Sequence, residues 1–170
     1  MTSTAPVVIR SAVTADVPAI AALVSSFAGD GPRLLRKATV TLYEDVQEFV
    51  VAIDGDQVVG CGALHVLWED LAEVRTLAVA ATVQRGGIGS LIVAELLHRA
   101  RRLGVRRVFC LTFATDFFAR HGFQEIEGAP VEPDVYQQLL ESYDQGVAEF
   151  LGLEQVKPNT LGNTRMLVDL

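Results

Sequence analysis

Residues 73–103 constrain the fold of this chain more strongly than any other stretch. EVRTLAV (73–79) has the pattern of a strand, QRGGIGS (84–90) follows it, and residues 88–103 repeat apolar side chains at helical spacing. Glycine loses more conformational freedom on folding than any other residue, so three glycines at the start of a helix must serve a purpose that side chains would obstruct. We therefore expect a strand that leads through a glycine turn into a long helix.

The front of this helix is predicted to bind an anion. The first four N–H groups of a helix have no partner inside it, and the helix dipole adds about 0.3–1 kcal/mol for an anion there. Hydrogen bonds to a charged group contribute about 1.5–3 kcal/mol each, so several of them outweigh the dipole. Gly86, Gly87 and Gly89 have no β-carbon to block the approach of a pyrophosphate, and Gln84 and Arg85 add side-chain donors.

The glycine spacing excludes two other phosphate-binding loops. The run is neither the G-x-x-x-x-G-K-[ST] of a P-loop nor the G-x-G-x-x-G of a dinucleotide site. From the glycines alone, one structural alternative stays open: a tight turn that lets the helix pack closely on the strand.

Composition limits the class of protein. With 170 residues, half of them hydrophobic, the chain is expected to form one domain over 1–170 with a real core. The net charge of −7 argues against a nucleic-acid partner. No apolar run approaches the roughly 18 residues of a membrane span, and MTSTAPVVIR lacks the pattern of a signal peptide, so we expect no membrane partner and a cytoplasmic location. The three histidines lack metal-ligand spacing, so no metal is expected.

The order of elements predicts an α/β fold. Strands are expected at 7–12, 47–54, 57–68, 73–79, 106–113, 123–128 and 164–170, and helices at 15–28, 40–46, 88–103, 115–122 and 134–151. Thr14 is the expected cap of the first helix. The buried stripe of the helix at 88–103 is expected to contain Ile92, Val93, Leu96, Ala100 and Leu103. This order predicts a mixed sheet with helices on both faces.

QRGGIG (84–89) fits the Q/R-x-x-G-x-G/A signature of the GNAT N-acetyltransferases, and FFARHGF (117–123) resembles the helix and strand start that follow the fifth strand in that family. The resemblance covers nearly the full chain. It implies the GNAT fold, a mixed and largely antiparallel central sheet splayed between strands 4 and 5, with acetyl-CoA as co-substrate. The acetyl-CoA contacts that it implies are Leu77, Ala78, Val79, Gln84, Arg85, Gly86, Gly87, Ile88, Gly89, Ser90, Thr112, Phe117 and Phe118.

Longer stretches, including VVGCGALHVLWEDLAEVRTLAV (58–79), resemble the acetyltransferase module of bacterial N-acetylglutamate synthases in its short stand-alone form. This implies acetyl transfer to the α-amino group of L-glutamate, the first step of arginine biosynthesis. Two other readings stay open: a GNAT enzyme that acts on another small amine or a protein N-terminus, and a non-catalytic acyl-CoA sensor.

An amino-acid substrate brings a carboxylate, so its site needs a cation. Arg36 matches an arginine that family members use for this purpose, and family members carry another just before the last strand, where this chain has Gly162. If neither Lys157 nor Arg165 replaces it, a neutral amide is favoured, so L-glutamine stays beside L-glutamate as a candidate. The expected substrate residues are Arg36, Lys37, Cys61, Arg75, Lys157, Thr164 and Arg165, although Cys61 and Cys110 each also fit a buried structural thiol.

Glu73 is the expected general base, acting directly or through water, because the amine must lose a proton before it attacks. Period-two spacing puts it on one face with Arg75, Leu77 and Val79. The alternative is that Glu73 only pairs with Arg75 or Arg36. Phe118 stands where many family members have a tyrosine, so the leaving thiolate is protonated by water or leaves unprotonated.

The segment 129–162 is an insertion with two expected roles. It either caps the substrate pocket or forms a homodimer contact, and the sequence leaves both open.

Overall fold

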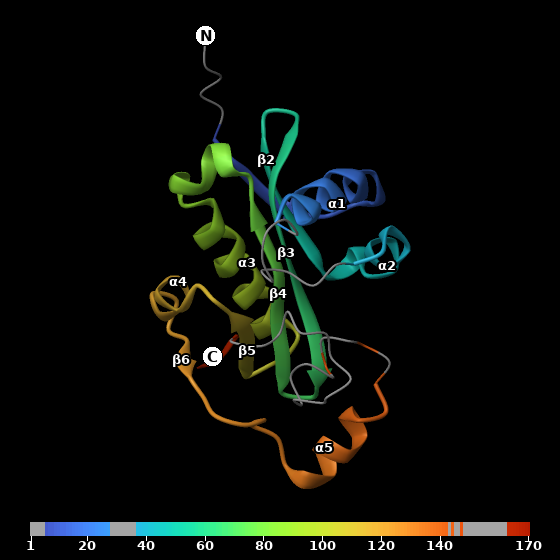
Figure 1. The fold of residues 1–170 in the computed structure, drawn as a ribbon, viewed down its shortest axis with the longest axis vertical. Coiled ribbons are helices and arrows are strands. Elements are labelled where there is room, and N and C mark those ends of the chain that lie inside the picture. Colours follow the sequence, from blue (N-terminus) through green and yellow to red (C-terminus); the bar gives the residue numbers. More distant parts are fainter. Residues whose placement is uncertain (1–5, 28–36, 143, 145–146, 148–162) are drawn as a thin grey trace.

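The computed structural model describes residues 6–27, 37–142, 144, 147 and 163–170 (Figure 1). Within these residues, seven strands form one sheet in the order β1-β2-β3-β4-β5-β7-β6. The strands are β1 Val8–Ser11, β2 Phe49–Asp54, β3 Gln57–Trp68, β4 Leu71–Val79, β5 Arg107–Thr112, β6 Gln124–Glu125 and β7 Thr164–Asp169. The α-helices are α1 Val17–Ser26, α2 Thr39–Glu44, α3 Ile88–Arg102, α4 Thr115–Ala119 and α5 Pro133–Leu139. The 3-10 helices are η1 Thr14–Asp16, η2 Val46–Glu48 and η3 Ala81–Gly86.

The sheet is mixed and opens in its middle. Every neighbouring pair is antiparallel except β4 and β5, which run parallel. Within these two fully described strands the ladder has three pairs, Leu71–Arg107, Ala72–Val108 and Glu73–Phe109, and β4 then continues for six residues to Val79. The predicted splay between the fourth and fifth strands is thus confirmed.

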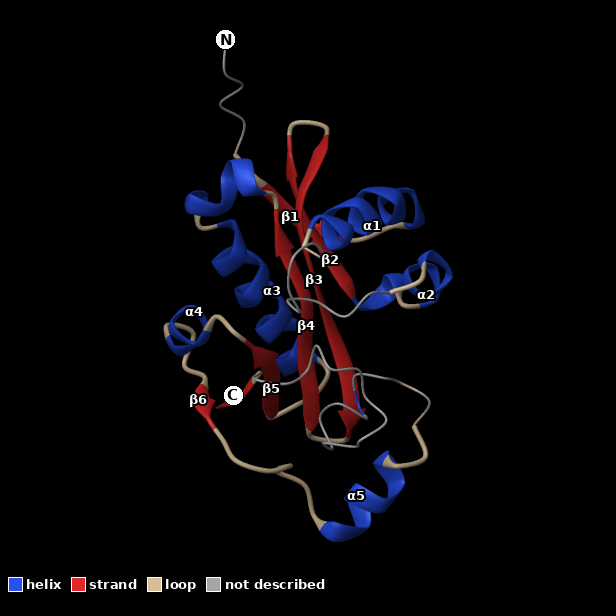
Figure 2. Ribbon diagram, viewed as in Figure 1, coloured by secondary structure: helices blue, strands red, loops and turns tan. Residues whose placement is uncertain are grey.

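Helices cover both faces of the sheet (Figure 2). The helix α3 packs on one face through Ile92, Val93 and Leu96, in a core that also contains Val74 of β4. The helices α1 and α2 pack on the opposite face around Phe49. A third cluster joins Leu71, Phe109, Leu139 and Val147, so the described part of the segment after β6 covers the sheet beside α1 and α2. Among the described residues, no helix has the length and apolar character needed to cross a lipid bilayer.

Two glycines of β3 set the distance between α3 and the sheet. A β-carbon on Gly60 would lie 2.9 Å from the Cδ1 atom of Ile92, and one on Gly62 would lie 2.7 Å from its Cγ2 atom. Both distances are well inside van der Waals contact, so only glycine permits this close packing. The helix is thereby held close over β3, the neighbour of the strand that leads into the glycine turn.

A β-bulge in β4 corrects the predicted strand face. Cys61 pairs with Ala78 and Ala63 with Arg75, so two residues of β4 oppose one of β3, and Thr76 takes a φ of +56°. Before the bulge, Glu73 and Arg75 face away from α3; after it, Leu77 and Val79 pack against the α3 core. The prediction that all four share one face is therefore right for Glu73 and Arg75 only.

Two predictions about helix ends were wrong. Thr14 does not cap the first helix: the carboxylate of Asp16 accepts the N–H of Val13 at 2.8 Å, and α1 begins at Val17. Leu103 is 63% exposed, because α3 ends at Arg102.

The helix expected at 134–151 is interrupted: α5 ends at Leu139, and Val147 is again helical. Just beyond it, the hydroxyl of Ser142 accepts the N–H of Asp144 at 3.2 Å, and the carboxylate of Asp144 accepts the N–H of Val147 at 3.2 Å. An aspartate that accepts the N–H three residues further on has the pattern of a helix N-cap, so these side-chain bonds separate the turn at Val147 from α5.

Candidate active site

The front of α3 presents main-chain donors where β4 ends. The first bond of the helix runs from the N–H of Leu91 to the carbonyl of Gly87 at 3.1 Å, so the N–H groups of residues 88–90 precede it. Gly87 is the N-cap and has no side chain to cap the helix, and the first turn contains no acidic residue. An anion bound here would be stabilised by the positive end of the dipole of a fifteen-residue helix.

The three glycines of the turn differ in what they permit. A β-carbon on Gly86 would meet only the Cγ1 atom of Ile88, at 4.0 Å, so this position opens to free space. Gly87 has a φ of +73°, which favours glycine for backbone reasons alone. A β-carbon on Gly89 would lie 3.3 Å from the Phe117 ring, so this glycine lets α4 approach α3. The turn therefore combines open backbone with close packing.

The remaining residues predicted to contact acetyl-CoA fall into two groups. Ser90 lies at the front of α3, where its hydroxyl is 3.1 Å from Nε2 of His121, and Phe117 lies beside Gly89. Ile88 and Phe118 are 3% and 5% exposed and form part of the α3 core, so their side chains pack inside the protein. The predicted side-chain donors of Gln84 and Arg85 lie outside what the structure describes.

The splay brings the backbone of Leu77, Ala78 and Val79 to the same end of the sheet as the front of α3, because β4 leads directly into η3 and α3. Thr112 is the last residue of β5, is 8% exposed, and accepts the N–H of Ala114 on its hydroxyl at 2.8 Å. Ladder alternation places Thr112 on the α3 face with Cys110.

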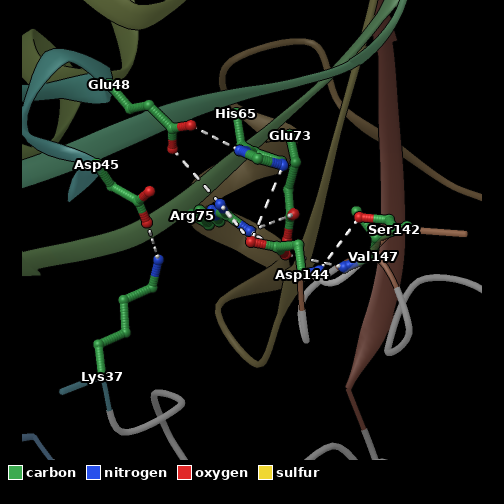
Figure 3. A network of polar contacts seen from close by, with 9 residues as sticks. All are labelled: Lys37, Asp45, Glu48, His65, Glu73, Arg75, Ser142, Asp144 and Val147. Atoms are coloured by element: carbon green, nitrogen blue, oxygen red, sulfur yellow. Dashed lines mark hydrogen bonds and ion pairs between the residues drawn. The ribbon is translucent and has the colours of Figure 1, made fainter. Parts of the chain in front are cut away.

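A polar cluster lies on the other face of the sheet (Figure 3). It is at the vertex of the splay, the point after the Glu73–Phe109 pair at which β4 and β5 separate. Its centre is Arg75, whose side chain is 9% exposed. The two terminal nitrogens of Arg75 donate to Asp144 at 2.7 and 3.1 Å, and one of them lies 3.4 Å from Glu48. Glu73 lies 3.8 Å from the nitrogen that is 2.7 Å from Asp144. Three carboxylates from different parts of the chain thus surround one guanidinium.

The electrostatics of the cluster favour charged groups. Burial acts to lower the pKa of Arg75, but the hydrogen bonds to Asp144 and the charges of Glu73, Asp144 and Glu48 raise it. Burial acts to raise the pKa of Asp144, but the hydrogen bonds and charge of Arg75 outweigh it and hold that pKa at about 2. Arg75 and Asp144 are therefore an ion pair throughout the neutral range.

Glu73 and His65 face each other across β3 and β4. They form a ladder pair, and Nδ1 of His65 lies 2.7 Å from a carboxylate oxygen of Glu48. Glu73 is 4% exposed and is the last residue of β4 that pairs with β5. Burial, followed by the charge of Glu73, raises the pKa of Cys110 on β5, in keeping with a position at the vertex of the splay.

The predicted substrate residues are not all brought together. Lys37 pairs with Asp45 at 3.3 Å on the α2 side of the cluster. Arg165 pairs with Leu111 in the ladder and so shares the face of Glu73, whereas Thr164 pairs with Thr112 and lies on the α3 face. Arg36 and Lys157 lie outside the described residues.

Cys61 does not border an open site. It is 0% exposed within the α1 and α2 core, and its thiol lies 3.6 Å from the carbonyl of Thr76. Burial raises its pKa to about 12. The structure thus favours the buried-thiol reading over the substrate-contact reading of Cys61.

Sequence reasoning missed Glu48 and Asp144. Asp144 is 69 positions from Arg75 in the chain, and no local pattern connects the two. In the part of the chain that the structure describes, no cluster of three or more His, Cys, Asp or Glu side chains is arranged to hold a metal ion.

Comparison with known proteins agrees with this architecture. Residues 21–123 match the model of the acetyltransferase (GNAT) family. An amino-acid acetyltransferase of Mycobacterium tuberculosis is 59% identical over 166 residues, which cover 96% of this chain and 94% of that protein. A crystal structure of a Mycobacterium tuberculosis protein in complex with CoA and NLQ has a TM-score of 0.92 and 58% identity, covering 96% of this chain and 99% of that one.

A more distant structure extends the comparison. N-acetylglutamate synthase from Neisseria gonorrhoeae, complexed with coenzyme A and N-acetyl-glutamate, has a TM-score of 0.77 and 26% identity. The match covers 99% of this chain but 36% of that protein. The family model spans more than half of the sequence, and the mycobacterial relative matches almost all of it, so this chain belongs to the GNAT acetyltransferase family.

Proposed function

We propose that this protein transfers the acetyl group of acetyl-CoA to the α-amino group of an amino acid, L-glutamate or L-glutamine. The observation that carries the proposal is the end of the β4–β5 ladder at Glu73. This buried carboxylate lies at the vertex of a splay whose open end leads to the main-chain donors of α3. The mycobacterial relative named amino-acid acetyltransferase supports the same activity.

The front of α3 would hold the pyrophosphate of acetyl-CoA. The N–H groups of Ile88, Gly89 and Ser90 precede the first bond of the helix, and the space beside Gly86 accommodates a group that a side chain would displace. The backbone of 77–79, beyond the last ladder pair, would border the pantetheine arm in the splay. The residues present therefore fit coenzyme A.

Glu73 would accept the proton that the amine must lose. The amine nitrogen forms a bond to the thioester carbon, the carbon–sulfur bond breaks, and coenzyme A leaves as a thiolate while the amine proton passes to Glu73, directly or through water. A thiol with a pKa of about 8.5 is an adequate leaving group, so its protonation by water suffices. Positioning of the two substrates would supply most of the rate.

The substrate carboxylates need cations on the face of Glu73. Arg165 shares that face, two strands from Glu73, and Arg36 and Lys157 stay predictions. A strong glutamate preference that survives both Lys157→Ala and Arg165→Ala would show that neither residue holds the γ-carboxylate. A comparison of kcat/KM for glutamate and glutamine decides between the two substrates.

The relative named amino-acid acetyltransferase argues against a non-catalytic reading. That reading rested on a phenylalanine at the place of a tyrosine, but Phe118 packs edge-on against Phe117 and Phe123 with ring centroids 5.1 and 5.2 Å apart. A residue buried between two rings serves the core, whichever group protonates the thiolate. We also propose that residues 1–170 form one acetyltransferase domain, because one sheet runs from Val8 to Asp169.

Three further points stay predictions: a role in the first step of arginine biosynthesis, a cytoplasmic location, and a homodimer.

A thiol-release assay with acetyl-CoA and each of the twenty amino acids tests the proposed function. We expect release with glutamate or glutamine, and a Glu73→Gln variant should lose about 10²–10⁴ in kcat while it still binds CoA. No release with any amino acid above the rate of acetyl-CoA hydrolysis would overturn the proposal. Release with another amine alone would reassign the substrate.

A further inference from the structure

One guanidinium connects the candidate base to the segment after α5. Arg75 lies 2.7 and 3.1 Å from the two carboxylate oxygens of Asp144, but 3.8 Å from Glu73, its neighbour on the same strand face. The shorter contacts go to the residue that is more distant in the chain. The guanidinium of Arg75 therefore lies closer to the carboxylate of Asp144 than to that of Glu73 (Figure 3).

We propose that Asp144 is a positioning residue for the acetyl transfer: it holds Arg75 in a bidentate ion pair and so keeps that cation from fully neutralising the carboxylate of Glu73. This inference rests on the proposed function. It also assigns Arg75 to the protein's own carboxylates rather than to the substrate, because both terminal nitrogens of its guanidinium are engaged by Asp144.

The groups around Glu73 set the sign of the effect. Arg75 is on its own strand, His65 is opposite on β3, and Cys110 lies on β5. Asp144 and Glu48 contact Arg75 and so affect Glu73 through that guanidinium. A nearby cation makes a carboxylate a weaker base, and a nearby anion makes it a stronger one. Loss of the Asp144 charge removes an anion and frees the cation, so both changes weaken Glu73 as a base.

Asp144 is well anchored for this role. Its carboxylate accepts the N–H of Val147, which is 2% exposed in the cluster with Leu71 and Phe109. Leu71 begins the strand that carries Glu73, and Phe109 is the ladder partner of Glu73. Asp144 is therefore tied, through Val147, to the residues that frame the candidate base.

A matched ion pair separates positioning from general stabilisation. Arg107 binds Asp70 at 3.0 Å and the carbonyl of Pro130 at 2.7 Å, so it also ties the segment after β6 to the sheet. In the described part of the chain its side-chain hydrogen bonds go to Asp70 and Pro130 and not to the Arg75 cluster, so Asp70→Asn is the control for Asp144→Asn. Both changes replace a carboxylate by an isosteric amide.

The test measures the protonation of Glu73 directly. The protein is labelled with glutamate that carries ¹³C in the side-chain carboxyl group, and the Glu73 signal is assigned as the one missing in Glu73→Gln. Its titration midpoint is followed in the wild type, Asp144→Asn, Asp70→Asn and Arg75→Gln, and kcat is measured for each. This readout does not depend on activity, so it stands even if the proposed function fails.

We expect Asp144→Asn to move the Glu73 midpoint to lower pH and to lower kcat at least about threefold, because a weaker base transfers a proton less readily. Asp70→Asn should leave both unchanged, and Arg75→Gln should move the midpoint to higher pH. If Arg75→Gln does not fold, Asp144→Asn and its control decide alone. An unmoved midpoint in Asp144→Asn, or a move to higher pH, would overturn the proposal.

Discussion

The Arg75–Asp144 pair shows how much a single buried contact contributes to the site. Its two side chains are 9% and 17% exposed, and Arg75 also faces Glu48 and Glu73. Removing one partner of such a pair leaves the other charge buried without compensation, which is strongly destabilising. The same contact therefore affects both the stability of the fold and the properties of the candidate base.

The first prediction concerns stability at acid pH. The pKa of Asp144 is held at about 2, below its ordinary value of 3.8, so its ionised form stabilises the fold by about 2 kcal/mol at neutral pH. That stability is fully present above about pH 4 and is lost as the pH falls toward 2. We expect the difference in unfolding free energy between wild type and Asp144→Asn to narrow from pH 5 to pH 3, measured by urea denaturation. A constant difference would show that Asp144 titrates normally.

The second prediction concerns the thiols. Cys61 is fully buried with a pKa raised to about 12, and burial raises the pKa of Cys110 as well. Because the thiolate is the reactive form, neither thiol should react with a disulfide reagent at pH 8 in the folded protein. Both should react after unfolding in guanidinium chloride. A rapidly reacting thiol in the native state would contradict the buried position of one of these two cysteines.

At the scale of elements, the contact between α3 and β3 decides where the front of α3 lies. Gly60 and Gly62 let Ile92 approach the strand, and a bulge at Thr76 turns the end of β4 toward the α3 core. The helix, the glycine turn and the splay are therefore one packed unit. A change in the contact should shift the front of α3 relative to the splay.

The third prediction follows from the atoms involved. Gly62→Ala should cost about 1–3 kcal/mol of unfolding free energy, because its β-carbon would meet Cγ2 of Ile92, next to that residue's own branch point. Gly60→Ala should cost less, because its β-carbon meets the flexible Cδ1 atom. Ile92→Val removes Cδ1 and keeps Cγ2, so in a double-mutant cycle it should relieve Gly60→Ala but not Gly62→Ala. Equal relief of both variants would contradict the packing described.

At the scale of the whole molecule, the parts that sequence predicted are those with local signals. The helix α3, the glycine turn before it and the splayed sheet follow from periodicity, glycine spacing and family resemblance. The bulge at Thr76 had no such signal, because its positive φ falls on a threonine rather than a glycine. Asp144 was missed because its partner is on a strand far away in the chain, and the end of α5 depends on side-chain bonds that no helical period reveals.

The central claim is that the main chain at the front of α3 holds the pyrophosphate of coenzyme A. Gly86 is the position at which to test it, because a β-carbon there meets almost nothing in the protein. A substitution at Gly87 would also strain the backbone, because Gly87 has a positive φ, so its effect on binding could not be assigned to a blocked site. The test is to measure the dissociation constants of CoA and of pantetheine, which lacks the pyrophosphate, for the wild type and for Gly86→Val.

We expect Gly86→Val to weaken CoA binding at least about tenfold and to leave pantetheine binding unchanged. A tenfold loss corresponds to about 1.4 kcal/mol, close to the lower end of the range for one charged hydrogen bond. An unchanged dissociation constant for CoA, or an equal loss for both ligands, would show that the pyrophosphate is bound elsewhere.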